Sequence, residues 1–149
     1  MVRPSLFAPL VALSLLLATP AAWALDYRSA AEVAVLWDAP SAKARKLYVL
    51  AKGSPVELVL AQDAWSKVRD DKGNMAWIET KSLSPTRTLL VRADRAQIRA
   101  RGEDRAPLVF EADKDVILEW QEAGPPGWVK VKHRDGQSGY VRIGQVWGL

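Results

Sequence analysis

The chain has 149 residues, with 21 Lys and Arg against 17 Asp and Glu, one His and no Cys. The absence of cysteine excludes a thiol nucleophile, a disulfide framework and a thiolate metal site. A single histidine argues against a zinc site built from several imidazoles. We therefore expect no metal and no cofactor. The net charge of +4 is modest and, together with the export signal described next, argues against nucleic acid as a partner.

Residues 1–24 have the three parts of a secretory signal. Arg3 supplies positive charge, an uncharged apolar run covers 6–18, and Ala22 and Ala24 place small residues where a signal peptidase reads. The run is shorter than the roughly 20 residues that span a bilayer, so cleavage after Ala24 is favoured over a membrane anchor. No later segment is apolar enough to span, and we expect the mature chain in the periplasm or secreted.

The mature chain contains one unit twice. Two stretches share a pattern at an offset of 63 positions: Trp65-Ser66-Lys67-Val68-Arg69-Asp70, Gly73 and Ala76-Trp77-Ile78, against Trp128-Val129-Lys130-Val131-Lys132-His133, Gly136 and Gly139-Tyr140-Val141. Upstream, Val33 and Val35 align with Ala96 and Ile98, again at 63, while Val56 aligns with Val116 at 60. We predict two domains, covering 25–85 and 86–149.

Each unit has the pattern of β structure. Apolar residues alternate at Val56 and Leu58 and again at Val129 and Val131, which is typical of strands with one buried face. Turn residues separate these runs, and Asp135-Gly136 is a strong hairpin signal. A sheet this small has exposed edges unless it curls. The predicted fold class is therefore all-β, with two small barrels.

The motifs resemble a known family. The order Lys52-Gly53, alternating strand, Trp65-x-x-Val68, Gly73, Ala76-Trp77-Ile78 and Leu83 resembles an SH3-like barrel, and its ending is similar to bacterial SH3-like domains of exported cell-envelope proteins. The second copy repeats this order. Eukaryotic SH3 domains have proline after the equivalents of Ile78 and Val141, where this chain has Glu79 and Arg142. This difference argues against proline-rich peptides as ligands.

Strand parity indicates which aromatic residues face solvent. If Val68 and Val131 point inward, Trp65 and Trp128 point outward, and the resemblance implies that an aromatic residue here lines a ligand groove. Alternatively, these indoles cover the barrel or pack between the copies. The candidate ligand-binding residues are Trp37, Tyr48, Trp65, Trp77, Trp128, Tyr140, Arg99 and Arg101. The two arginines flank Ala100 on an expected strand face and could bind carboxylates or phosphates, or simply be solvated.

No catalytic constellation is evident. His133 aligns with Asp70 at the mouth of a hairpin, which indicates an exposed turn residue and not a general base. Neighbouring carboxylates, such as Asp70 with Asp71 and Asp113 with Asp115, fall in predicted turns and not across a cleft. We expect no enzyme activity.

The segment 84–92 has strand-forming composition and is expected to close the first barrel and lead directly into the second, holding the two rigidly. Only three residues follow Val146, so the second copy would lack its closing strand. We expect the first copy to cap this edge or a partner to pair with it.

These features predict a non-catalytic exported SH3-like module that contacts a cell-wall peptide of peptidoglycan. The alternative is a protein–protein interaction module that binds another envelope protein through its aromatic face or an open strand edge.

Overall fold

The computed structural model describes residues 24–149, so the predicted export signal lies outside the described residues except for Ala24. Within this range the chain forms short strands and two 3₁₀ helices, and neither helix could cross a membrane. The first half contains β1 (Asp26–Ala30), β2 (Ala34–Trp37), β3 (Lys46–Leu50), β4 (Pro55–Gln62), β5 (Trp65–Arg69), β6 (Met75–Glu79), η1 (Thr80–Ser82) and β7 (Leu83–Ser84). The second half contains β8 (Thr88–Val91), β9 (Arg95–Arg99), β10 (Leu108–Asp113), β11 (Ile117–Ala123), β12 (Trp128–Lys132), β13 (Ser138–Arg142), η2 (Ile143–Gln145) and β14 (Val146–Trp147).

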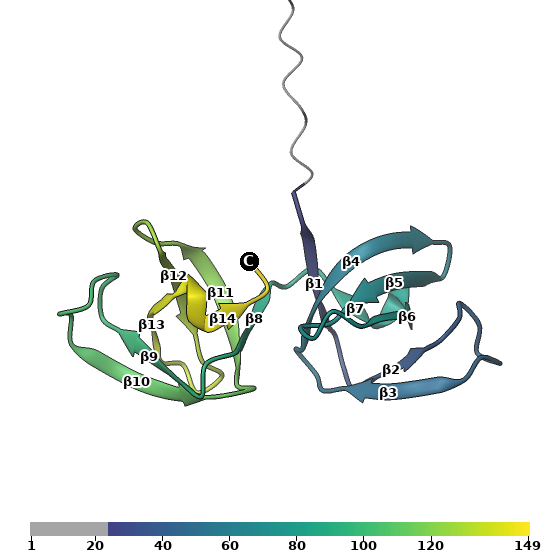
Figure 1. Ribbon diagram of the computed structural model, residues 1–149, viewed down its shortest axis with the longest axis horizontal. Helices are drawn as coiled ribbons and strands as arrows, with labels where there is room; N and C mark the ends of the chain where they lie inside the picture. Colours follow the sequence, from purple (N-terminus) through teal and green to yellow (C-terminus); the bar gives the residue numbers. More distant parts are fainter. Residues whose placement is uncertain (1–23) are drawn as a thin grey trace, which may run out of the picture.

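The strands form two antiparallel sheets with the same order. The first sheet runs β3-β2-β6-β5-β4-β1-β7, and the second runs β10-β9-β13-β12-β11-β8-β14. Figure 1 shows them as two separate lobes, with β1 and β8 nearest the middle. We call them the first copy and the second copy. The identical order confirms the predicted all-β duplication.

Local sequence explains the central strands of each copy. Val68 on β5 and Ile78 on β6 are almost completely buried, and they alternate with outward side chains as a half-buried strand requires. The hairpin between β5 and β6 turns at Gly73, whose φ is +86°, and its counterpart turns at Gly136, with φ of +97°. Glycine adopts this left-handed conformation without a steric penalty.

The alignment between the copies differs from the predicted one. On β2 and β9 the buried pairs are Ala34 with Leu36 and Ala96 with Ile98, so the offset is 62 and not 63, and Val33 is 68% exposed. The prediction chose the larger valines over Ala34. Because side chains alternate between faces, a one-residue difference in the alignment assigns buried positions of β2 to the solvent face and exposed positions to the core.

The alignment of β4 with β11, the strands that precede Trp65 and Trp128, also differs from the predicted one. Leu58 pairs with Val68 and Trp120 pairs with Val131, so Leu58 corresponds to Trp120 at an offset of 62, and the predicted offset of 60 is wrong. A shift of two residues keeps every side chain on the same face. The alternating pattern therefore could not distinguish 60 from 62.

The second copy is closed by its own strands. β8 pairs with β11 and with β14 in the second sheet, so the prediction that 84–92 closes the first barrel is wrong. In the first copy, β1 and β7 take the equivalent places. The expected gap beyond Val146 does not exist, because Val146 pairs with Val91. Composition predicted a strand here but could not show which sheet it joins.

Each sheet encloses its own hydrophobic core. The first core contains Ala30, Ala34, Leu36, Val56, Val68, Ala76 and Ile78. The second contains Leu89, Val91, Ala96, Ile98, Ala112, Leu118, Val129, Val131, Val141 and Val146. Trp120 is half-buried and packs against the second core.

Arg87 joins the two copies. Its guanidinium carbon lies 5.9 Å from the centre of the Tyr27 ring in the first copy and 5.1 Å from that of Trp120 in the second. It also donates a hydrogen bond of 3.0 Å to the carbonyl of Gly148. The Tyr27 ring meets Trp147 edge-on, with centroids 5.3 Å apart. We call this contact region the seam.

Two hydroxyl groups add hydrogen bonds at the seam. The Ser29 hydroxyl donates to the carbonyl of Thr86 at 2.7 Å, and the Thr88 hydroxyl donates to the carbonyl of Gly53 at 2.6 Å. Ser29 and Thr88 are buried, so their hydroxyl groups would otherwise lose water without replacement. The seam thus combines ring packing with these two hydrogen bonds, while the buried Nε of Arg87 has no hydrogen-bond partner among the described residues.

Candidate ligand-binding face

Strand register gathers aromatic and charged side chains on the outward side of the first copy. Since Val68 and Ile78 point into the core, the residues that alternate with them point away from it. Trp37 pairs with Trp77 across β2 and β6 and shares this side. The resulting aromatic face consists of Trp37, Trp65, Lys67, Trp77 and Glu79.

The rings of the aromatic face contact one another and nearby cations. Trp37 and Trp65 meet edge to face, with ring centroids 6.1 Å apart and planes at 89°. The amine of Lys46 lies 5.5 Å from the Trp37 ring, and that of Lys67 lies 5.9 Å from the Trp77 ring. Trp37 is buried by these neighbours, while Trp65 and Trp77 stay half-buried. Two indole rings therefore reach solvent beside two amines.

The equivalent face of the second copy is covered. Trp128 corresponds to Trp65 but is only 8% exposed, so the prediction that its ring faces water is wrong. The guanidinium carbon of Arg142 lies 4.8 Å from the centre of the Trp128 ring, and Nε of Arg142 donates to Asp104 at 3.1 Å. The second tryptophan is outside the core cluster, as parity predicts, but a stacked arginine shields it.

The remaining predicted residues of the second copy do not form one patch. Tyr140 is half-buried, with the Lys130 amine 6.0 Å from its ring. Arg99 pairs with Tyr140 across the strands and donates to the carbonyl of Ala106 at 2.9 Å. Arg101 lies beyond the end of β9 and forms an ion pair with Glu103 at 2.9 Å. The expectation that both arginines lie on one strand face is therefore wrong.

Tyr48 lies apart from the aromatic face. It pairs with Leu36 on β2 and packs against the first core, and its hydroxyl donates to Oδ2 of Asp70 at 2.8 Å. Asp70 also accepts from the side chain of Asn74 at 3.0 Å and from the backbone N–H groups of Lys72 and Asn74 at 2.9 and 2.8 Å. Tyr48 thus supports the hairpin between β5 and β6 and does not line the predicted surface with Trp65.

These hydrogen bonds change two pKa values. Burial raises the pKa of Asp70, but the hydrogen bonds from Tyr48, Asn74 and Lys72 outweigh burial and hold the pKa below its usual value of 3.8. Burial, together with the hydrogen bond to Asp70, raises the pKa of Tyr48 well above its usual value of 10. The pair is therefore a neutral phenol donating to an ionised carboxylate at neutral pH.

His133 occupies the place of Asp70 in the second copy. Its ring lies 5.8 Å from the Phe110 ring, where the first copy has Tyr48 and Asp70, and Nδ1 of His133 accepts from the backbone N–H of Asp135 at 3.3 Å. His133 lies at the hairpin as predicted, but its side chain is half-buried and not exposed as expected. The tyrosine–carboxylate pair of one copy is replaced by a pair of rings in the other.

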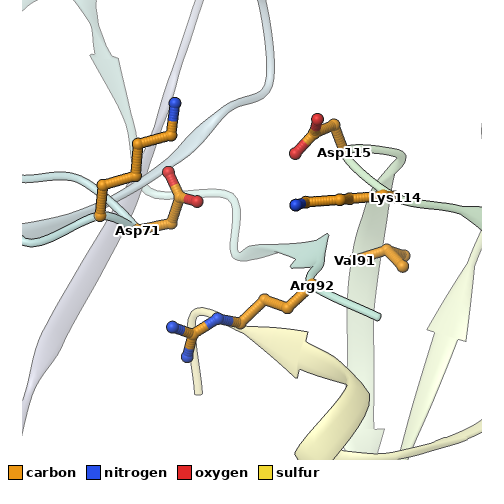
Figure 2. A pocket seen from close by; sticks show the side chains of 6 residues that line it. Asp71, Val91, Arg92, Lys114 and Asp115 are labelled. Carbon is orange, nitrogen blue, oxygen red and sulfur yellow. The ribbon is translucent and has the colours of Figure 1, made fainter. Parts of the chain in front are cut away.

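A cavity of about 410 Å³ opens between the first copy and the second copy, away from the seam residues, and sequence reasoning missed it. It is lined by Asp71, Lys72, Val91, Arg92, Lys114 and Asp115. Figure 2 shows the Lys114 amine and the Arg92 guanidinium extending from the second copy toward the side that carries Asp71. Among the described residues none of these charged groups forms an ion pair. No sequence pattern reports how two copies face each other, so no signal could have revealed this cavity.

Comparison with known families assigns the fold. Residues 30–85 and 92–148 each match the family described as bacterial SH3 domain. The chain belongs to this family, and the prediction of two SH3-like units in tandem is confirmed. No curated protein sequence matches the chain.

Similar solved structures include NlpC and NlpC/P60 proteins, and this chain spans about half the length of each. NlpC1 from Trichomonas vaginalis is 16% identical with a TM-score of 0.39, and the similarity covers 91% of this chain and 50% of that protein. NlpC2 from Trichomonas vaginalis is 12% identical with a TM-score of 0.39, covering 83% and 48%. An NlpC/P60 family protein from Bacillus cereus is 14% identical with a TM-score of 0.37, covering 81% and 55%.

Proposed function

We propose that this chain is a non-catalytic binding module of the cell envelope, whose aromatic face in the first copy binds a peptide of the cell wall. The observation that carries the proposal is the edge-to-face pair of Trp37 and Trp65 on the outward side of a bacterial SH3 domain. Indole rings offer large contact areas and few rotatable bonds, so little conformational entropy is lost when a ligand packs on them.

The charges around the face fit a peptide with free carboxylates. Lys46 and Lys67 lie beside the rings of Trp37 and Trp77, and an amine there can pair with a ligand carboxylate. Stem peptides of peptidoglycan are short, extended and rich in carboxylates. Indole rings with amines beside them suit that combination.

Export is part of the proposal. We infer that residues 1–24 direct secretion and that the mature protein acts in the periplasm or outside the cell. Mass spectrometry of the protein recovered from a periplasmic or culture fraction tests this inference. We expect a chain that begins at Leu25, whereas a cytoplasmic protein that retains residues 1–24 would contradict it.

Sedimentation with purified, protein-free sacculi tests the binding function. We expect the mature protein to pellet with sacculi, Trp65→Ala to lose binding by about tenfold, which corresponds to roughly 1.4 kcal/mol, and Tyr140→Ala to bind normally. Tyr140 is the matched control because it corresponds to Trp77 but lies in the second copy. Absence of sedimentation, or equal binding by Trp65→Ala, would refute the proposal.

One observation favours the alternative, an envelope protein as partner. β3 is an outermost strand of the first sheet, and its side chains Leu47 and Val49 are 37% and 58% exposed. An outer strand can pair with a strand of another chain. A photo-crosslinker at Val49 in living cells separates the two functions: a defined protein adduct with no sacculus binding would support the alternative.

A further inference from the structure

The two copies differ at one pair of residues beside the equivalent tryptophans. In the first copy Trp65 on β5 faces Glu79 on β6. In the second copy Trp128 on β12 faces Arg142 on β13. Directly opposed side chains in an antiparallel pair lie within contact distance. The tryptophan therefore has a carboxylate neighbour in one copy and a guanidinium neighbour in the other.

The second copy shows what chemistry fits above this indole. The guanidinium carbon of Arg142 lies 4.8 Å from the ring centre of Trp128, and the guanidinium forms an ion pair with Asp104. A cation over the face of tryptophan is attracted by the negative potential of the ring. The remaining hollow has a volume of about 60 Å³, enough for a few waters. The chain's own arginine thus fills the second site.

The first copy has the same indole without the cation. Among the described residues, Lys46 lies beside Trp37 and Lys67 beside Trp77, but no Lys or Arg lies over Trp65. Glu79 stands in the place of Arg142 and forms an ion pair of 3.0 Å with Lys81. The Lys81 side chain is 80% exposed, and ion pairs this exposed are weak. Glu79 is therefore available as a counter-ion for another cation.

We propose that the first copy binds an amine or guanidinium side chain of a peptide ligand, stacked on Trp65 and paired with Glu79, and that Arg142 closes the equivalent site in the second copy. This inference rests on the proposed function and specifies the ligand further. A peptide with both carboxylates and a cationic side chain meets the amines at the rim and the carboxylate beside Trp65. The protein then has one binding site and not two.

Nuclear magnetic resonance of the ¹⁵N-labelled indole N–H groups tests the inference with small probes. The probes are the N-acetyl methylamides of lysine, arginine, norleucine and glutamate. We expect the lysine and arginine probes to shift the Trp65 signal, with affinity about fivefold above that of norleucine, since a cation and an indole attract each other. The glutamate probe is expected to bind most weakly at Trp65, and the Trp128 signal is expected to stay in place with every probe.

Four variants, one of them a control, separate the contributions of charge and shape. Glu79→Gln keeps the shape of the side chain and is expected to remove the preference for lysine over norleucine. Glu111→Gln is the matched control, since Glu111 forms a similarly exposed ion pair with Arg95 in the second copy. Arg142→Gln is expected to open the second site, so that the lysine probe also shifts the Trp128 signal. Asp104→Asn releases the same arginine and is expected to give a partial shift.

The outcomes distinguish this inference from the proposed function. Equal affinity for lysine and norleucine, an unchanged preference in Glu79→Gln, or a Trp128 shift in the unmodified protein would each overturn it. Sacculus binding that requires Trp65 but not Glu79 would leave the proposed function in place and refute the cation site. Binding of the lysine probe at Trp65 without any sacculus binding would support the cation site and refute the proposed function.

Discussion

Replacing Tyr48 by phenylalanine removes one hydroxyl and keeps the ring that packs on the first core. The hydroxyl donates a 2.8 Å hydrogen bond to the ionised carboxylate of Asp70, and hydrogen bonds to charged groups contribute about 1.5–3 kcal/mol. Asp70 keeps its bonds from Asn74 and Lys72. We therefore expect the unfolding free energy to fall by an amount near the lower end of this range, about 1.5 kcal/mol. At ~4 °C per kcal/mol, this lowers the melting temperature by roughly 6 °C.

The loss should depend on pH at both ends of the scale. The pKa of Asp70 is lower in the folded state, so its stabilisation is complete above pH 3.8 and is lost as the pH falls through the folded pKa. The pKa of Tyr48 is raised, so its contribution is complete below pH 10 and is lost as the pH rises above it. The free-energy difference between the two proteins should thus be largest between these limits and shrink outside them.

Urea unfolding of both proteins at pH 3, 7 and 11, followed by circular dichroism, measures this difference. Phe110→Tyr in the second copy is a useful comparison, because the side chain beside Phe110 is the imidazole of His133, where the first copy has the carboxylate of Asp70. Equal stability of Tyr48→Phe and the parent protein at pH 7, or a difference that is constant across the three pH values, would refute the role assigned to the Tyr48–Asp70 pair.

Three further changes test other contacts. Gly139→Ala places a Cβ 2.6 Å from the carbonyl of Arg99 and should cost about 1–3 kcal/mol of unfolding free energy; a neutral result in urea unfolding contradicts the close approach. Arg87→Met should lower the unfolding free energy contributed by the seam by about 2 kcal/mol, so that the single calorimetric transition splits into two. A single, unshifted transition would show that the seam does not couple the copies. Thr88→Val leaves the carbonyl of Gly53 without its 2.6 Å partner and should lower stability by about 1 kcal/mol, measured as a lower urea midpoint at an unchanged slope.

The candidate site was predictable where it depends on neighbours along the chain. The spacing of Trp65 from Val68, and of Trp77 from Ile78, placed both aromatic residues outside the core, because side chains alternate along a strand. Tyr48 was placed wrongly, since its partner Leu36 belongs to the buried set and turns Tyr48 toward the core. The cover over Trp128 comes from Arg142 and from Asp104, which lies 38 residues away from that arginine. No local pattern indicates a contact over that separation.

The amino-acid sequence alone determined that the chain is β structure, that its unit occurs twice, and which residues of the central strands face the core. These properties follow from side-chain alternation and turn chemistry, which act over a few residues. Only the tertiary structure decided the offset of 62 between β4 and β11, the membership of β8 in the second sheet and the stacking of Arg142 on Trp128. Alternation is unchanged by a shift of two residues and does not depend on the neighbouring sheet, so these choices are made by long-range packing of the whole sheet.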